Sequence, residues 1–205
     1  MFLYMLELYK NIGEIEVGLD ECARGVMFGR LYAAAVIMPK DKLKDNFFEN
    51  IKDSKKLSKK KREELYDYII KNCIEYSISW IDEKEIDKIN ILQANLKAFH
   101  LCLDKLKTNY THILVDGIHF NSYNCFTHEC IKGGDNKYIS IAAASILAKV
   151  SHDKYIMDLC EKESELKKYD LHNNMGYGTK KHIEAINKYG SSSYHRKTFG
   201  ICKIK

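Results

Sequence analysis

The sequence predicts an α/β domain in which helices flank a mixed central sheet. Four apolar segments have the length and pattern of strands, and the first two are separated by a turn too short for a helix. Amphipathic helical segments separate the later strands. The 205 residues are 45% hydrophobic and 30% charged, with one proline and no visible repeat or linker. One compact domain, or a domain with a small appendage, is therefore expected.

Strands are expected at 15–20, 31–38, 74–81 and 111–117. The second is apolar enough for burial on both faces, and the short turn before it predicts a hairpin with the first. The third, IEYSISWI, alternates strictly. One of its faces has Ile74, Tyr76, Ile78 and Trp80, and the other has Glu75, Ser77 and Ser79.

Helices are expected at 59–72, 85–107, 140–162 and 180–189. Ser58 is the predicted N-cap of the first, and Thr179 and Gly190 bound the last. The segment 85–107 has one apolar face, with hydrophobic residues recurring at spacings of three and four. Helix 140–162 begins with small residues.

Composition restricts the class of protein. The seven cysteines are odd in number and scattered, which indicates reduced thiols and an intracellular, cytoplasmic protein. The start MFLYMLELYK lacks a basic leader and is too short to span a membrane, so no membrane partner is expected. The net charge of +5 is compatible with a polyanionic partner.

One cysteine cluster could hold a metal. In CFTHEC, Cys125, His128 and Cys130 could bind zinc, but the spacing is uncommon and no fourth ligand is evident. A packed loop is the favoured interpretation.

Acidic residues follow two of the predicted strands. Asp20 ends strand 15–20 and Glu21 follows it, and strand 111–117 ends in Asp116 and Gly117. Ligands gather at strand ends in open α/β sheets, so the three carboxylates meet if these strands are neighbours. Taken alone, the pair Asp20–Glu21 is equally explained as a polar turn.

Helix 140–162 supplies a fourth acid. Ser145, Lys149 and Asp153 are spaced by four and lie along one side of it, although Lys149 and Asp153 could simply form an exposed ion pair. Four converging carboxylates repel one another unless cations bind, and hard oxygen ligands select Mg²⁺ or Mn²⁺ over zinc. Two such ions, about 4 Å apart, can activate water and stabilise the leaving oxygen in phosphoryl transfer.

Two basic stretches accompany the acids. DSKKLSKKKR spans 53–62, and residues 179–205 hold seven Lys or Arg against one acid, Glu184. Either stretch alone is explained as a solvated face. Together they favour a nucleic-acid partner for the acidic site.

Several motifs occur in an order that resembles the ribonuclease HII family, the type 2 ribonucleases H. They are GLDECARG, DSKKLS, INILQANLKA, ILVDG, SIAAASILAKVSHD, GYGTKKHIEAINKYG and HRKTF. The resemblance extends from about residue 13 to residue 200. The related ribonuclease HIII family has an additional N-terminal domain, for which the position of Asp20 leaves no room.

The resemblance implies a ribonuclease H-like fold, with a catalytic core at 1–165 and a basic helical substrate-binding extension at 166–205 in one compact unit. It implies a monomeric endonuclease that uses Mg²⁺ or Mn²⁺, with two ions during catalysis. The substrates would be the RNA strand of RNA/DNA hybrids and single ribonucleotides in duplex DNA, cut to leave 5′-phosphate and 3′-hydroxyl ends. No replication-clamp partner is readable from the C-terminal FGICKIK.

The resemblance also assigns residues. Asp20, Glu21, Asp116 and Asp153 match the four metal-binding acids of the family. Ala23, Arg24 and Gly25 match the triplet that reads the 2′-hydroxyl, and Tyr177 matches the tyrosine at the RNA–DNA junction. Positions matching phosphate-contacting or site-supporting residues are Ser54, Lys55, Lys149, Lys181, His195 and Arg196.

The triplet departs from the family pattern. The family has glycine where this chain has Ala23, and usually proline where it has Val26. If position 23 needs a positive φ, alanine costs roughly 1 kcal/mol there. Cleavage at a single embedded ribonucleotide is the activity that this change puts in doubt.

Two other functions remain open from the sequence. One is a nucleic-acid-binding protein of the same fold that does not cleave. The other is an unrelated Mg²⁺-dependent phosphohydrolase acting on a small substrate.

Overall fold

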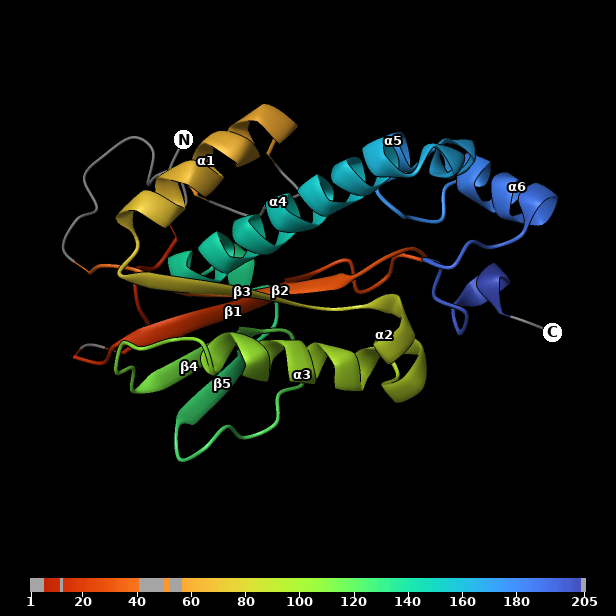
Figure 1. The fold of residues 1–205 in the computed structure, drawn as a ribbon. Coiled ribbons are helices and arrows are strands. Elements are labelled where there is room, and N and C mark those ends of the chain that lie inside the picture. Colours follow the sequence, from red (N-terminus) through yellow and green to blue (C-terminus); the bar gives the residue numbers. More distant parts are fainter. Residues whose placement is uncertain (1–5, 12, 41–49, 52–56, 204–205) are drawn as a thin grey trace.

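The computed structural model describes residues 6–11, 13–40, 50–51 and 57–203. A five-stranded sheet lies between two helical layers, with α1 and α4 on one face and α2 and α3 on the other (Figure 1). The strand order is β3-β2-β1-β4-β5. This arrangement confirms the predicted mixed sheet with flanking helices.

The two central strands form the predicted hairpin. β1 (Glu16–Cys22) pairs antiparallel with β2 (Leu31–Ile37), and β3 (Glu75–Ile81) extends the antiparallel side. β4 (His112–Asp116) pairs parallel with β1, and β5 (Thr127–Ile131) pairs parallel with β4. β5 was not predicted, because CFTHEC was interpreted as a packed loop. Thr127 and Glu129 are polar and exposed on this edge strand, so the segment lacks an apolar strand pattern.

β3 alternates as predicted, but its serine face is the buried one. Ser77 and Ser79 point toward α3, where the Ser77 hydroxyl donates to the Cys102 carbonyl (2.7 Å). Trp80 lies on the opposite face and is 45% exposed. Small side chains let α3 approach the sheet closely, so hydrophobicity alone did not indicate which face is covered.

Three helices match their predicted bounds to within one residue. They are α1 (Lys59–Asn72), α4 (Ile139–Lys162) and α6 (Lys180–Tyr189). The Ser58 and Thr179 side chains cap the first and last of these, accepting from the Lys61 and His182 backbone N–H groups.

The predicted helix 85–107 is in fact two helices. α2 (Glu83–Ile89) ends and α3 (Ile91–Leu103) begins at Asn90, whose φ of +68° is incompatible with a continuous helix. The Asn90 side chain accepts from the Leu92 and Gln93 N–H groups and so caps α3. Apolar spacing continues across the break, which is why it was not recognised.

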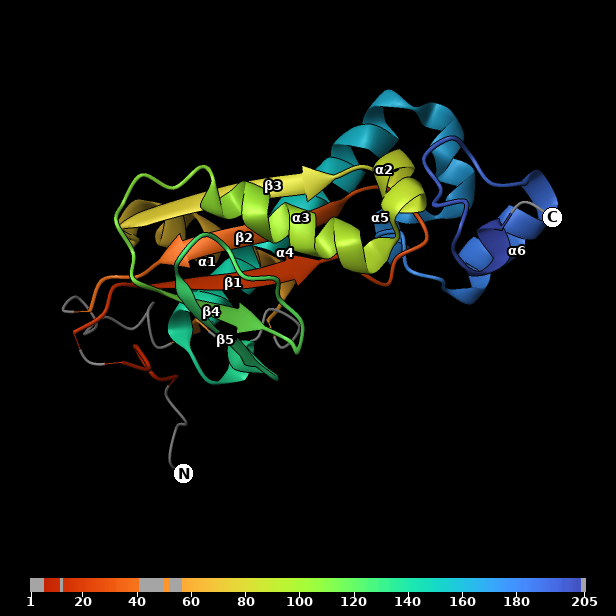
Figure 2. The same ribbon diagram turned by 90° about the horizontal axis from the view of Figure 1, so that it is seen from below.

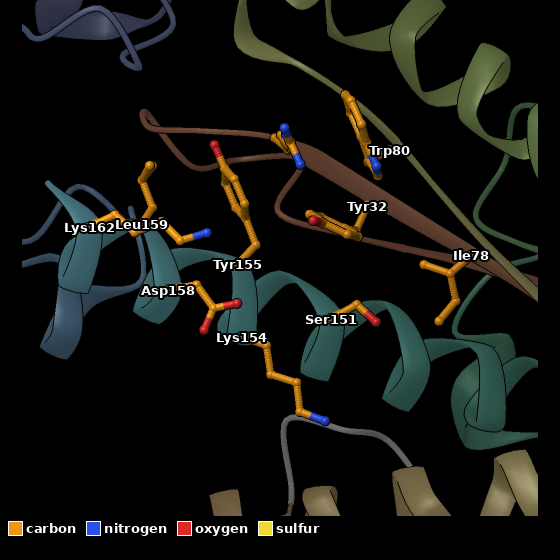
Figure 3. A pocket seen from close by; sticks show the side chains of 10 residues that line it. Tyr32, Ile78, Trp80, Ser151, Lys154, Tyr155, Asp158, Leu159 and Lys162 are labelled. Atoms are coloured by element: carbon orange, nitrogen blue, oxygen red, sulfur yellow. The ribbon is translucent and has the colours of Figure 1, made fainter.

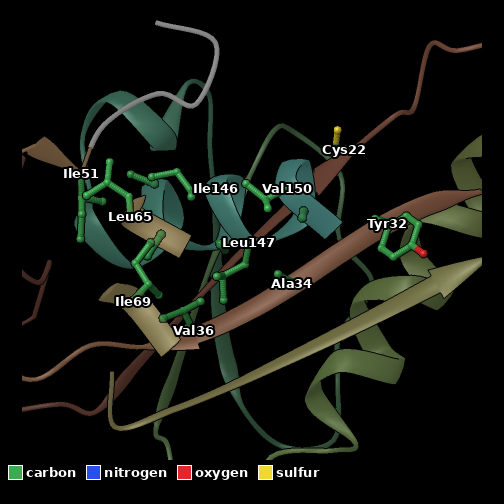
Figure 4. Packing of buried hydrophobic residues seen from close by; sticks show 14 of the residues in the cluster. Cys22, Tyr32, Ala34, Val36, Ile51, Leu65, Ile69, Ile146, Leu147 and Val150 are labelled. Carbon is green, nitrogen blue, oxygen red and sulfur yellow. The ribbon is translucent and has the colours of Figure 1, made fainter. Parts of the chain in front are cut away.

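Apolar packing fixes α4 over the sheet. Leu65 and Ile69 of α1 and Ile146 and Leu147 of α4 pack over Val36 of β2 (Figure 4). α4 crosses β1 at Gly18, where an added Cβ would lie 2.3 Å from the Ser140 carbonyl carbon. Glycine is therefore required for this approach, which holds the helix against the strand that ends in Asp20.

The C-terminal segment packs against the far half of α4 and the β1–β2 turn. It contains the 3₁₀ helix η4 (Ser164–Tyr169), α5 (Leu171–Asn174), α6 and the short η5 (Gly200–Cys202). Leu166 and Tyr169 share an apolar cluster with Phe28 and with Ile156 of α4. In Figure 2 this segment lies beside α2, at one end of the molecule. None of the helices described is long and apolar enough to cross a membrane.

Candidate active site

The predicted meeting of strand-end acids takes place between β1 and β4. The two strands are parallel neighbours and Leu19 pairs with Val115, so the next residue of each, Asp20 and Asp116, lies at the same end of the sheet. Glu21 follows directly on β1. We call Asp20, Glu21 and Asp116 the strand-end acids.

Burial and the neighbouring carboxylates dominate the electrostatics of Asp20. Asp20 is 4% exposed, and burial together with the charges of Glu21 and Asp116 raises its pKa well above the ordinary value. Its carboxylate accepts from the Glu21 backbone N–H (2.7 Å), and Ser145 of α4 also hydrogen-bonds to it. Asp116 accepts from the Gly134 N–H (2.7 Å), and Arg24 lies 3.8 Å from Glu21.

Asp153 has the opposite environment. Lys149, one turn earlier on α4, donates to it at 2.8 Å, the His152 ring lies at 3.1 Å, and Arg62 of α1 approaches to 3.9 Å. Burial alone would raise the pKa of Asp153, but hydrogen bonds from His152 and Lys149 lower it below the ordinary value. The exposed ion pair considered as an alternative is excluded, because the Lys149 and Asp153 side chains are largely buried.

The strand-end acids suit a divalent cation. They offer only carboxylate oxygens, the ligands that Mg²⁺ and Mn²⁺ prefer, and a cation there would offset the burial and the repulsion from Glu21 and Asp116 that raise the pKa of Asp20. Among the described residues, no three Asp, Glu, His or Cys side chains already surround a common point as ligands. Side-chain rotations would therefore accompany cation binding.

A cavity of about 210 Å³ opens beside these acids. It is lined by Asp20, Glu21, Cys22, Ala23, Arg24, Gly25, Ser145, Lys149 and Tyr177. Two of the acids, Asp20 and Glu21, therefore share one cavity with the predicted recognition triplet and the predicted junction tyrosine. Burial raises the pKa of the Cys22 thiol to about 12, so it stays protonated and is no nucleophile.

Ala23 has the backbone conformation that the family glycine would favour. Its φ is +70°, a left-handed conformation that costs a residue with a Cβ about 1 kcal/mol or more. Arg196 supports this turn from inside, where its guanidinium is fully buried and donates to the carbonyls of Arg24 (3.1 Å), Val26 (3.0 Å) and Gly29 (2.9 Å).

Tyr177 is connected to a buried histidine pair. His182 and His195 face each other with their Nε2 atoms 3.1 Å apart. His182 Nδ1 donates to the Tyr177 carbonyl (2.9 Å), and His195 Nδ1 accepts from the Ser192 backbone N–H (2.9 Å). A carbonyl can only accept, so His182 carries its proton on Nδ1. His195 accepts at Nδ1 and therefore carries its proton on Nε2. Both rings are thus neutral, and His195 Nε2–H donates to His182 Nε2. The pair thereby fixes the loop that presents Tyr177, whose side chain is 43% exposed.

The other predicted contact positions lie in varied surroundings. Ser54 and Lys55 lie outside the described residues. Lys181 is exposed on α6, and Lys149 lines the cavity with its ammonium 5.7 Å from the Tyr177 ring centre. His195 is 1% exposed and Arg196 is fully buried, so of the two roles expected, phosphate contact or site support, their burial leaves only support.

Sequence reasoning did not single out Arg62, His152 or His182. Arg62 ends the basic stretch 53–62, and His152 directly precedes the candidate acid Asp153. For both residues, the available signal was their place in or beside a segment already singled out. His182 gave no such signal, because its partner His195 is distant in the sequence. No zinc ligand set including Cys125, His128 and Cys130 occurs among the described residues; the His128 ring instead packs against Phe120.

Comparisons with known proteins concern the chain as a whole. The family model described as Ribonuclease HII matches residues 17–202. The ribonuclease HII of Bacteroides fragilis is 45% identical over 199 residues, covering 96% of this chain and 94% of that protein. In the solved complex of PCNA with ribonuclease HII from Archaeoglobus fulgidus, the matched chain is 24% identical with a TM-score of 0.74, covering 91% of this chain and 95% of that chain. The Bst ribonuclease HIII in complex with Mn²⁺ is 16% identical with a TM-score of 0.71, covering 93% of this chain and 68% of that chain.

Proposed function

Because this chain belongs to the ribonuclease HII family and is a type 2 ribonuclease H, we propose that Asp20, Glu21, Asp116 and Asp153 are its catalytic and metal-binding residues. The observation that carries the proposal is the pairing of β1 with β4, which places the three strand-end acids at one end of the sheet. Asp153 of α4 joins them through Lys149, which donates to Asp153 and lines the same cavity.

The proposed cofactor is Mg²⁺ or Mn²⁺, held by the strand-end acids, with two ions during catalysis. Such ions activate water and stabilise the leaving oxygen of a phosphodiester. The Mn²⁺ complex of the Bst ribonuclease HIII supports this proposal by fold analogy. Lys149, His152 and Arg62 orient Asp153 and keep it ionised, so it is available as a base or ligand at neutral pH.

The proposed substrates are RNA/DNA hybrids and duplex DNA with embedded ribonucleotides, cut to leave 5′-phosphate and 3′-hydroxyl ends. Residues 23–25 would contact the 2′-hydroxyl, a group that distinguishes RNA from DNA. Tyr177 would stack on the sugar at the RNA–DNA junction, with Lys149 and Lys181 near phosphates. The C-terminal segment 166–205 would complete the substrate surface, because it carries Tyr177 and buttresses the 23–29 turn through Arg196.

Strand cleavage tests this proposal. Two labelled duplexes are incubated with Mg²⁺ and, separately, with Mn²⁺: one has a single ribonucleotide in DNA, the other a run of ribonucleotides opposite DNA. We expect both to be cut, and Asp20→Asn to abolish both activities, which excludes a contaminating nuclease. Binding of both duplexes without cleavage under either metal would contradict the catalytic assignment and favour a non-catalytic binding protein.

A further inference from the structure

A second hollow, larger than the catalytic cavity, lies between α4 and the edge of the sheet (Figure 3). Its volume is about 640 Å³, and it shares no lining residue with the catalytic cavity. Tyr32, Ile78 and Trp80 line it from β2 and β3, and Tyr155 and Lys154 line it from α4. We call it the Trp80 pocket. None of the roles assigned above uses it.

Two of its aromatic side chains lie close to one cation. The Arg30 guanidinium lies 3.7 Å from the ring centre of Trp80 and 4.5 Å from that of Tyr155. The N–H groups of a guanidinium lie in its own plane, so contact with aromatic rings leaves donors for an anion. Trp80 keeps 45% of its surface exposed, unusual for a tryptophan without a partner.

The pocket has an excess of positive charge. Arg30, Lys154 and Lys162 line it, against one acid, Asp158. None of these three cations forms an ion pair with any residue in the described part of the chain. An occupant should therefore combine a flat apolar group with negative charge.

A smaller hollow lies between the Trp80 pocket and Asp153. It is lined by Asp153 and Arg62 on one side, and it shares Lys154 and Asp158 with the Trp80 pocket. Lys59, Arg62 and Lys154 line this hollow together with the acids Glu63, Asp153 and Asp158. A polyanionic strand that follows this course from Asp153 to Trp80 therefore meets three cations, each close to a carboxylate.

We propose that the Trp80 pocket binds an unpaired nucleotide of a single-stranded segment that continues from the substrate duplex. The base lies on the Tyr32–Ile78–Trp80 surface, and the adjoining phosphates contact Arg30, Lys154 and Lys162. Stacking on aromatic rings within a basic groove is how single strands are bound without sequence preference. The inference extends the proposed function, since it names a substrate form with a single-stranded tail.

Trp80 is the only tryptophan of the chain, so its fluorescence reports on this pocket alone. Octathymidylate is titrated into the metal-free protein at low salt, and saturable quenching is expected. Arg30→Gln and Lys154→Gln should each weaken binding about threefold to tenfold and lower the salt dependence by about one counterion. The matched control is Lys107→Gln, which removes an exposed lysine beside Glu75, at the opposite end of β3 from Trp80. It should retain wild-type affinity.

Three other probes separate the possible occupants. Thymidine monophosphate should quench only at much higher concentration, and a blunt DNA duplex should not quench Trp80. A hexaglutamate peptide should not compete. Quenching by thymidine monophosphate at the concentration that suffices for octathymidylate would overturn the assignment to a strand. Displacement by the acidic peptide would overturn it in favour of a protein partner.

Cleavage provides a second readout. Duplexes with one ribonucleotide are prepared blunt, with a 5′ tail or with a 3′ tail of eight thymidines. Wild-type protein should cut one of the tailed duplexes faster than the blunt duplex. Trp80→Ala should lower this ratio of cleavage rates by about tenfold and should cut the blunt duplex at the wild-type rate. If Trp80→Ala keeps the wild-type preference for tailed duplexes, or if octathymidylate does not quench Trp80, the proposal is overturned. The fluorescence assay needs no catalysis, so a failed cleavage assay would contradict the proposed function alone.

Discussion

The carboxylates in the two halves of the candidate active site, α4 and the strand ends, have opposite electrostatic environments. On α4, Asp153 is surrounded by Lys149, His152 and Arg62, and hydrogen bonds lower its pKa. At the strand ends, Asp20 is buried beside Glu21 and Asp116, and burial and repulsion raise its pKa. Protein cations thus surround the carboxylate of one half of the site, whereas burial and neighbouring carboxylates dominate around Asp20 in the other half.

This difference indicates what each half is for. A carboxylate already paired with protein cations gains less from a metal ion, because its charge is compensated. Carboxylates that repel one another gain the most, because a cation removes their repulsion and replaces the water lost on burial. We therefore expect the strand-end acids to dominate metal affinity and Asp153 to depend on α4 and α1 for its orientation.

The largest expected effect is on catalysis. Asp116→Asn removes one strand-end charge while keeping a similar shape, so cleavage should fall by about a thousandfold or more, the contribution of a catalytic metal. Duplex binding should stay within a few-fold of wild type. The control is Asp67→Asn on the exposed face of α1, which should cut normally. Single-turnover cleavage measures both, and normal turnover by Asp116→Asn would remove this residue from the site.

The sharpest contrast is in stability, where the two halves should respond with opposite signs. In metal-free protein at pH 7, Asp153→Asn should lower stability by about 1.5–3 kcal/mol, because hydrogen bonds from charged donors are lost. Asp20→Asn should raise it, because ionised Asp20 is disfavoured in the folded state. Thermal unfolding with a chelator measures both. A loss of stability in Asp20→Asn equal to that in Asp153→Asn would contradict the comparison.

The pH dependence follows from the same carboxylates. A raised folded pKa means that the Asp20 contribution to stability is present at low pH and is lost as the pH rises through that pKa. A lowered folded pKa means that the Asp153 contribution is present above the ordinary aspartate pKa and is lost as the pH falls below it. Asp20→Asn should therefore flatten the decline of metal-free stability at rising pH, as thermal melts across pH 4–8 would show.

A smaller effect is expected at the His182–His195 pair. Burial, with His182 and Lys197 nearby, lowers the pKa of His195 to about 3, so the folded protein keeps this ring neutral. The unfolded chain takes up a proton below about pH 6.5, so this contribution is lost progressively as the pH falls from there toward 3. His195→Asn should be less stable at pH 7 and should lose less of its stability between pH 7 and pH 5.

Exposed His119 provides the matched control for that experiment, since His119→Asn should follow the wild-type pH curve. Cleavage at a single ribonucleotide should fall more in His195→Asn than duplex binding does, because the Tyr177 loop loses its anchor. A pH curve for His195→Asn parallel to that of wild type would show that the pair does not control acid sensitivity.

The smallest effect is expected at Ala23. Ala23→Gly relieves the strain of a φ of +70° but adds freedom to the unfolded chain, so stability should rise by only about 0.5 kcal/mol, or roughly 1–2 °C in Tm. The ratio of single-ribonucleotide to hybrid cleavage should rise if alanine limits access to the 2′-hydroxyl. A destabilisation by Ala23→Gly would mean that the turn is not strained.

The fold could be predicted from sequence wherever local pattern and tertiary packing agree. Helix 140–162 matched because its small residues are the side chains that let α4 approach Gly18. The break at Asn90 was missed because it depends on one positive φ, which hydrophobic spacing does not register. β5 was missed because a short polar edge strand has no apolar pattern.

The acids could be predicted for a different reason: each lies at a strand end or on a helix face, and the sequence pattern indicates both kinds of position. The pattern does not indicate the charges that surround each acid. These charges depend on contacts such as Arg62–Asp153 between α1 and α4, and on the pairing of β1 with β4. His195 and Arg196 also resembled surface contacts in a basic stretch, whereas the structure places both in the interior.

The most direct test of the contrast between the two halves is calorimetric titration of Mn²⁺ into the metal-free protein without substrate. Wild-type protein should bind Mn²⁺, Asp20→Asn should lose about a hundredfold in affinity or more, and Asp153→Asn should stay within about threefold of wild type. Equal losses in the two variants would contradict the account, because Asp153 would then share the metal on the same terms as the strand-end acids.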